Sequence, residues 1–105
     1  MYEIIYIKAD YEPWWMFDDW EQMVQTRKAF DNIVEAKAYL DELNALFISK
    51  FTCSEMRKNK FFAYWSPQER IFCEGCDDNL QIFHGIISFQ DGNPTSLVLD
   101  NNSNI

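Results

Sequence analysis

Residues 32–51 read NIVEAKAYLDELNALFISKF, and this stretch decides the fold class. Its large apolar side chains recur at intervals of three and four residues, which places them along one stripe of an α-helix. The stripe consists of Ile33, Ala36, Leu40, Leu43, Phe47 and Phe51. Asn32 precedes Glu35 by three residues, which is the pattern of an N-terminal capping box. We therefore predict one long amphipathic helix with a single buried face.

Stretches typical of β-strands lie on both sides of this helix. Residues 2–8 (YEIIYIK) and 60–65 (KFFAYW) are rich in β-branched and aromatic residues and contain no strand breaker. Both faces of the first stretch are largely apolar, which predicts a central strand that is covered on both sides. We expect a turn at residues 66–69, then a strand at 70–73 that forms a hairpin with 60–65. Residues 80–90 follow as the last strand.

The order of these elements predicts an α+β fold: a small antiparallel sheet of about four to five strands with one long amphipathic helix packed on one face. Residues 24–29 alternate weakly and are a candidate edge strand, and such an edge could pair with a second copy to form a homodimer. The 105 residues allow one domain. We place it at residues 1–90, with residues 91–105 as a flexible C-terminal tail.

Composition and charge exclude several classes of protein. Apolar residues make up 48% of the chain and aromatic residues 17%, which is too much for a disordered chain. No apolar run approaches the ~20 residues of a membrane span, so we expect no membrane association. Three cysteines, an odd number, and the lack of a basic-then-apolar leader predict a reduced, cytoplasmic protein. The net charge of −8 disfavours general nucleic-acid binding, because the phosphate backbone is also negative.

The first candidate site is the segment DYEPWWMFDDW, residues 10–20, which we call the aromatic loop. Tryptophan is enriched in binding hot spots because it buries a large area at a low entropic cost. The acidic residues beside the indoles suit a protein partner with a basic segment. The same indoles are also suited to cover the open face of the sheet as core. The interaction candidates are Glu12, Trp14, Trp15, Asp18, Asp19 and Trp20.

The second candidate is the CxxC motif of Cys73 and Cys76, with His84 eight residues further on. Two cysteines at this spacing can bind one Zn²⁺, but a structural zinc site takes four ligands. A second CxxC or a His pair is absent from the sequence, so the fourth ligand would be Cys53 or a carboxylate. The alternatives are a reactive thiol and, for His84, a hydrogen-bonded core histidine. We expect no resident cofactor, with zinc at Cys73, Cys76 and His84 as the alternative.

A third hypothesis concerns the basic and aromatic stretch at residues 57–65. Residues 27–70 carry a net charge of +2, whereas the segments before and after them carry −5 each. Arg57, Lys58 and Lys60, followed by Trp65, are residue types that bind and stack on single-stranded nucleic acid. The alternative is a solvated loop that leads into a core strand.

Taken together, these segments resemble an uncharacterised bacterial family of Gram-positive organisms, domain-of-unknown-function family 1033. The resemblance rests on the opening strand with the aromatic loop, on Ala63-Tyr64-Trp65, and on residues 72–84 (FCEGCDDNLQIFH). It extends over about residues 2–90. It implies no activity, and no catalytic residue is assigned. We therefore expect a small, acidic, non-catalytic interaction module that acts through the aromatic loop.

Overall fold

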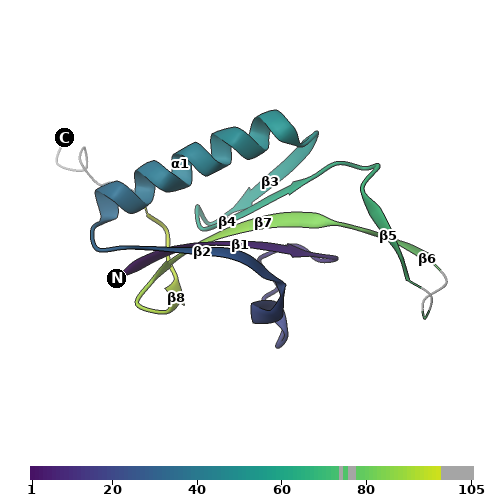
Figure 1. Cartoon of the computed structure of the whole chain (residues 1–105), viewed down its shortest axis with the longest axis horizontal. Helices are drawn as coiled ribbons and strands as arrows, with labels where there is room; N and C mark the ends of the chain where they lie inside the picture. The colour runs from purple at the N-terminus through teal and green to yellow at the C-terminus, as the bar shows by residue number, and fades with distance from the viewer. Residues whose placement is uncertain (74, 76–77, 98–105) are drawn as a thin grey trace.

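An antiparallel sheet with the strand order β2-β1-β7-β4-β3 lies at the centre of the protein, and one helix covers one of its faces (Figure 1). The structure is a computed structural model that describes residues 1–73, 75 and 78–97, and only the backbone of residues 73 and 78. Its elements are β1 (Tyr2–Ala9), a 3₁₀ turn η1 (Trp20–Met23), β2 (Val24–Phe30), α1 (Ile33–Lys50), β3 (Cys53–Arg57), β4 (Phe61–Trp65), β5 (Arg70–Cys73), β6 (Asp78–Gln81), β7 (Phe83–Gln90) and β8 (Asn93–Pro94). This arrangement confirms the predicted α+β class.

Helix α1 begins where its capping residue dictates and buries the face that the sequence predicts. The backbone N–H of Glu35 donates to Oδ1 of Asn32 over 2.8 Å, which satisfies one of the free donors of the first turn. The buried residues of α1 are Ala36, Leu40 and Phe47, all members of the predicted stripe. Within the described residues, no helix is long and apolar enough to cross a membrane.

Replacement of Asn32 by alanine is expected to lower the free energy of unfolding by about 1 kcal/mol, because the N–H of Glu35 loses its acceptor. For a domain of this size, the melting temperature would then fall by about 4–8 °C. Urea and thermal unfolding, followed by circular dichroism, measure the two quantities. Asn32→Asp is the matched control because it keeps an acceptor at the same position. An equal loss in both variants would contradict the capping role.

Both faces of the sheet carry an apolar core because alternate residues of the central strands point in opposite directions. The core beneath α1 contains Ile4, Ala36, Leu40, Phe47, Tyr64, Ile86 and Leu97. The core on the opposite face contains Ile5, Ile7, Phe61, Ile87 and Phe89. Residues 2–8 therefore form a central strand covered on both sides, as predicted, and β2 forms an edge of the sheet.

The predicted hairpin between residues 60–65 and 70–73 is wrong. Strand β4 pairs with β3 and β7, whereas β5 pairs with β6 in a separate two-stranded sheet. The strand expected at 80–90 is divided at Ile82 between β6 and β7. A tight turn between β3 and β4 explains the difference: Lys58 and Asn59 both have positive φ, and the N–H of Lys60 donates to the carbonyl of Arg57.

The chain beyond β7 folds back onto the sheet. The N–H of Thr95 donates to the carbonyl of Ser88 over 2.8 Å, and the hydroxyl of Ser88 donates to the carbonyl of Thr95 over 2.6 Å. Leu97 is only 1% exposed and belongs to the core beneath α1. The packed core therefore includes residues beyond residue 90, while residues 98–105 lie outside the described part of the chain.

Candidate functional site

The aromatic loop is docked on the face of the sheet opposite α1. Pro13 is fully buried against Gly85 of β7, where an added Cβ would lie 2.6 Å from the Cβ of Pro13. Only glycine at this position leaves room for the loop. Trp20 stacks on Phe89 at a centroid distance of 5.6 Å, and Trp14 packs on the same core. These contacts confirm that the loop covers the second face of the sheet.

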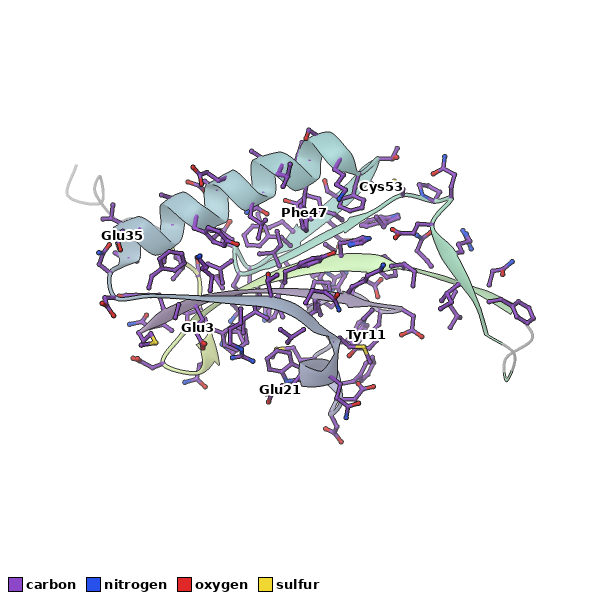
Figure 2. The ribbon with its side chains drawn as sticks, viewed as in Figure 1. Glu3, Tyr11, Glu21, Glu35, Phe47 and Cys53 are labelled. Carbon is purple, nitrogen blue, oxygen red and sulfur yellow. The ribbon has the colours of Figure 1, made fainter. Side chains whose placement is uncertain are left out.

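The outer side of the loop presents a cluster of three rings, the exposed Trp15 and Phe17 and the half-buried Tyr11, which we call the aromatic cluster. Trp15 is 56% exposed and Phe17 is 49% exposed. Their rings are nearly parallel, with 3° between the planes and 6.0 Å between the centroids. Tyr11 meets Phe17 edge to face at 4.8 Å. Figure 2 shows Tyr11 beyond the sheet on the side away from α1, the side on which Glu21 also lies.

Acidic side chains surround the aromatic cluster and bind its polar edges. Trp15 Nε1–H donates to Oε1 of Glu12 over 3.2 Å, and the hydroxyl of Tyr11 donates to Oδ1 of Asp19 over 3.1 Å. Burial, the hydrogen bond to Asp19 and the negative charges of Asp19 and Asp10 raise the pKa of Tyr11 to about 12. Within the described residues, the carboxylates of Asp10, Glu12 and Asp19 form no ion pair. The surface is therefore aromatic and negatively charged.

The structure divides the six predicted interaction residues into two groups. Glu12, Trp15, Asp18 and Asp19 belong to the outer surface, whereas Trp14 and Trp20 hold the loop on the sheet. Sequence reasoning missed Tyr11 and Phe17 as members of the surface. The sequence signal that could have identified them is their residue type, since both are aromatic residues within an acidic loop.

The nucleic-acid hypothesis remains a prediction: Arg57, Lys58 and Lys60 lie together at the β3–β4 turn, whereas Trp65 lies at the far end of β4. The guanidinium carbon of Arg57 lies 4.1 Å from the centroid of the Trp14 ring, so this side chain is already engaged by an aromatic face. Lys58 and Lys60 lie at the β3–β4 turn, whereas Trp65 ends β4 and packs edge to face on Phe83. Of the aromatic residues between them, Phe61 and Tyr64 are buried in the two cores, whereas Phe62 is only partly buried.

His84 lies under the C-terminal end of α1 with a partner on each ring nitrogen. The hydroxyl of Tyr6 lies 2.6 Å from Nδ1, and Oε1 of Glu69 lies 2.7 Å from Nε2. A carboxylate can only accept, so we assign the proton to Nε2 and the donated hydroxyl hydrogen to Nδ1. Phe51 stacks on the imidazole at 4.2 Å. Burial and the charge of Glu69 raise the pKa of Tyr6, which keeps its hydroxyl protonated.

The zinc and thiol hypotheses remain predictions. Cys76 and the side chain of Cys73 lie outside the described residues. A metal ion bound to His84 would have to displace either Tyr6 or Glu69 from the ring. Among the described residues, no group of three or more histidine, cysteine and acidic side chains is arranged to hold a metal ion.

Ionisation of the buried Tyr64 is expected to destabilise the folded protein at alkaline pH. Its hydroxyl donates to Oδ1 of Asn44 over 2.6 Å, and burial raises its pKa to about 12. Because the folded state holds the proton more tightly than the unfolded state, this contribution to stability is complete below pH ~10 and is lost as the pH rises towards ~12. We expect a loss of roughly 2–3 kcal/mol across that interval.

The test compares wild type with Tyr64→Phe in urea unfolding at a series of pH values between pH 8 and pH 12. The variant should lose less stability than wild type as the pH rises, because the buried ionisable group is gone. Equal losses in the two proteins would contradict the assignment to Tyr64.

The fold and this surface define a small α+β domain that presents an acidic aromatic loop. The chain belongs to DUF1033, a family of proteins of unknown function, whose profile matches residues 1–103. The match extends past residue 90, where the resemblance recognised from the motifs ends. No curated protein and no solved structure matches the chain.

Proposed function

We propose that this protein is a non-catalytic interaction module whose aromatic cluster binds a basic segment of another protein. One observation carries this proposal: the rings of Trp15 and Phe17 are nearly parallel, and each is about half exposed to solvent. Leaving such large apolar rings in water forfeits stability that burial would provide. A binding role accounts for that exposure.

The chemistry of the surface favours a cationic partner. An arginine guanidinium or a lysine ammonium is attracted to the negative face of an aromatic ring. The carboxylates of Asp18 and Asp19 can pair with the same cations and raise the rate of encounter. Tyr11, with a pKa of about 12, keeps its proton at neutral pH and donates it to Asp19.

The anchoring contacts prepare the surface for binding. Pro13 against Gly85 and Trp20 against Phe89 hold the loop on the sheet before any partner arrives. A preformed surface loses little conformational entropy on binding, so more of the contact energy appears as affinity.

We further propose that the module acts in the cytoplasm. Cys53 is a free thiol that is half-buried in the structure. An odd number of cysteines, three, is unsuited to a complete set of internal disulfides and fits a reducing compartment. Measurement of the free thiols in protein isolated under alkylating conditions tests this point, and three alkylated cysteines are expected.

The binding proposal is tested with two end-blocked peptides, one of alternating arginine and glycine and one of alternating glutamate and glycine. Tryptophan fluorescence and calorimetry measure the affinity of each. The arginine peptide should bind with a 1:1 stoichiometry, and its affinity should fall as salt shortens the Debye length from ~10 Å at 0.1 M towards ~3 Å at 1 M. Equal affinities for the two peptides, or no binding to either, would overturn the proposal.

A further inference from the structure

Strand β3 is an edge of the sheet that α1 leaves uncovered. It pairs with β4 alone in the described part of the chain, so its outer side presents unpaired backbone N–H and C=O groups. Ser54 and Met56 lie opposite Tyr64 and Phe62, which contribute to the α1 side of the sheet. Met56 is nevertheless 50% exposed. Both the outer backbone groups of β3 and the side chain of Met56 are thus accessible to a partner.

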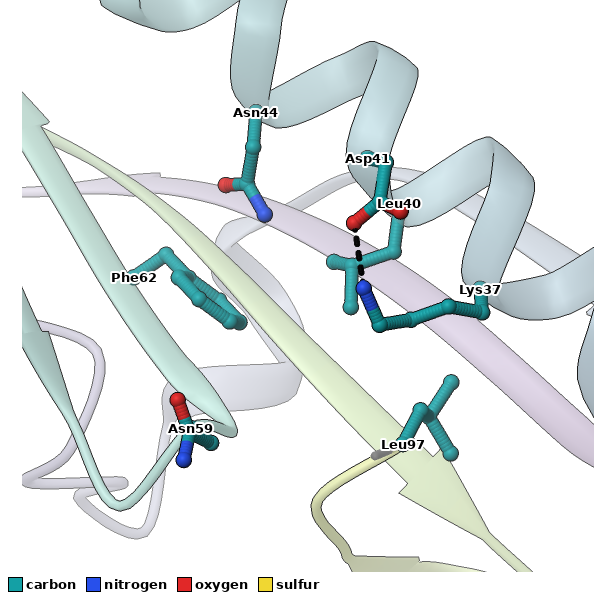
Figure 3. A pocket seen from close by; sticks show the side chains of 7 residues that line it. All are labelled: Lys37, Leu40, Asp41, Asn44, Asn59, Phe62 and Leu97. Carbon is teal, nitrogen blue, oxygen red and sulfur yellow. Dashed lines mark hydrogen bonds and ion pairs between the residues drawn. The ribbon is translucent and has the colours of Figure 1, made fainter. Parts of the chain in front are cut away.

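A groove runs between this edge and α1, and we call it the edge groove. Its outer part is a hollow of about 260 Å³, lined by Asn44, Ile48, Ser54, Glu55, Met56, Phe62 and Tyr64. Through Asn44 and Phe62 it adjoins a second hollow of about 470 Å³ that reaches Leu97 (Figure 3). Figure 3 shows Asn44 on the helix and Phe62 on the strand facing this second hollow from its two sides.

The chemistry of the edge groove fits an extended peptide. A free strand edge accepts another strand through backbone hydrogen bonds, and an adjacent groove receives alternate side chains of that strand. Ile48 is 64% exposed on the helix side of the groove, opposite Met56 on the strand side. Two apolar side chains spaced two residues apart would therefore be received between α1 and β3.

Lysine side chains near the two ends of β3 favour acidic residues at the two ends of a bound peptide. Lys50 precedes the strand, and Lys58 and Lys60 follow it; none of the three forms an ion pair within the described residues. The acid on the strand, Glu55, is paired with Arg57 at 3.0 Å. Lys50 and Lys60 lie over the rings of Phe51 and Phe61, each at 5.7 Å, and have no carboxylate partner among the described residues. The charges around β3 that lack a carboxylate partner are thus positive, although the whole chain carries −8.

We propose that β3 and the edge groove bind an extended segment of another protein as an additional antiparallel or parallel strand, with apolar residues at alternate positions and acidic residues at its ends. This site is separate from the aromatic cluster. Arg57, whose guanidinium lies over Trp14, belongs to the face of the sheet opposite α1, whereas the edge groove lies on the α1 side.

The test uses an end-blocked peptide of about seven residues, enough to span the five residues of β3 at ~3.4 Å per residue. It carries valine at alternate positions, threonine between them and glutamate at each end. A second peptide has the same side chains with N-methyl groups on alternate backbone amides, and a third has lysine at its ends. Calorimetry measures each affinity, and ¹⁵N spectra locate the bound peptide on the protein.

The first peptide should bind and shift the amides of β3, whereas methylation and the exchange to lysine should each weaken binding at least ~10-fold. Ile48→Glu should weaken it to the same extent. Val34→Glu is the matched control because Val34, also on α1, is 63% exposed and does not line the groove. This control variant should bind like wild type.

Three results would overturn the proposal. The first is no binding of the glutamate-ended peptide, and the second is equal binding of the N-methylated peptide, which would mean that no strand is added. The third is a concentration-dependent dimer that Ile48→Glu dissociates, because the occupant would then be a second copy of this chain. Analytical ultracentrifugation of wild type and Ile48→Glu measures the last.

Discussion

Alanine in place of Trp15 is expected to weaken binding of the arginine peptide at least ~30-fold, which corresponds to ~2 kcal/mol and to the usual threshold of a hot spot. The reason is that Trp15 supplies the largest exposed ring of the aromatic cluster and stacks with Phe17. The free energy of unfolding should change by less than ~0.5 kcal/mol, because the side chain lies outside both cores.

The control for this variant is Phe72→Ala. Phe72 on β5 is 56% exposed, the same fraction as Trp15, but it lies in the separate hairpin. Its removal should leave peptide affinity unchanged. Calorimetry and urea unfolding of the two variants are measured side by side. Wild-type affinity in Trp15→Ala would contradict the account, and so would unfolding of that variant, since the ring would then be structural.

The largest loss of stability is expected from Phe47→Ala, at about 3–5 kcal/mol. Phe47 is 5% exposed and joins α1 to the sheet through edge-to-face contacts with Tyr6 at 5.1 Å and Tyr64 at 5.5 Å. It also meets the ring of His84 at 6.4 Å. Its removal would leave a cavity at the junction of helix, β1, β4 and β7, which neighbouring rings can fill only in part.

Urea unfolding measures this loss, and Leu46→Ala is the neighbouring control. Leu46 precedes Phe47 on α1 and is 56% exposed, so its truncation should cost less than ~0.5 kcal/mol. Similar losses in the two variants would show that helix propensity, rather than packing of Phe47 on the sheet, dominates at this end of α1.

The helix and several strands could be predicted because their signals are local: the stretches at 2–8, 24–29, 60–65 and 70–73 correspond to β1, β2, β4 and β5. The cap at Asn32 and the apolar stripe lie within one segment, and the apolar residues of β1 and β4 are contiguous. Strand β3 escaped prediction because its five residues, CSEMR, are mostly polar and exposed, as suits an edge. The pairing of the strands could not be predicted from the sequence either, because β7 lies between β1 and β4 in the sheet but follows both of them in the sequence.

The candidate site could be located from sequence but not resolved into its parts. Three tryptophans among acids mark residues 10–20 as unusual on composition alone. Which indoles are buried depends on Gly85 and Phe89 of β7, which receive Pro13 and Trp20. The spacing of Phe17, Trp20 and Val24 also suggests a short helix from about residue 18, whereas the structure has the 3₁₀ turn η1 (Trp20–Met23) and begins β2 at Val24.

The most direct test of the central claim follows the four indole N–H signals in ¹H–¹⁵N spectra while the arginine peptide is added. The account predicts that the signal of Trp15 shifts with saturation and that the signals of Trp14, Trp20 and Trp65 move little, because only Trp15 lies on the binding surface. Assignment comes from single Trp→Phe variants. Binding that leaves the Trp15 signal in place would contradict the claim that the aromatic cluster is the interaction surface.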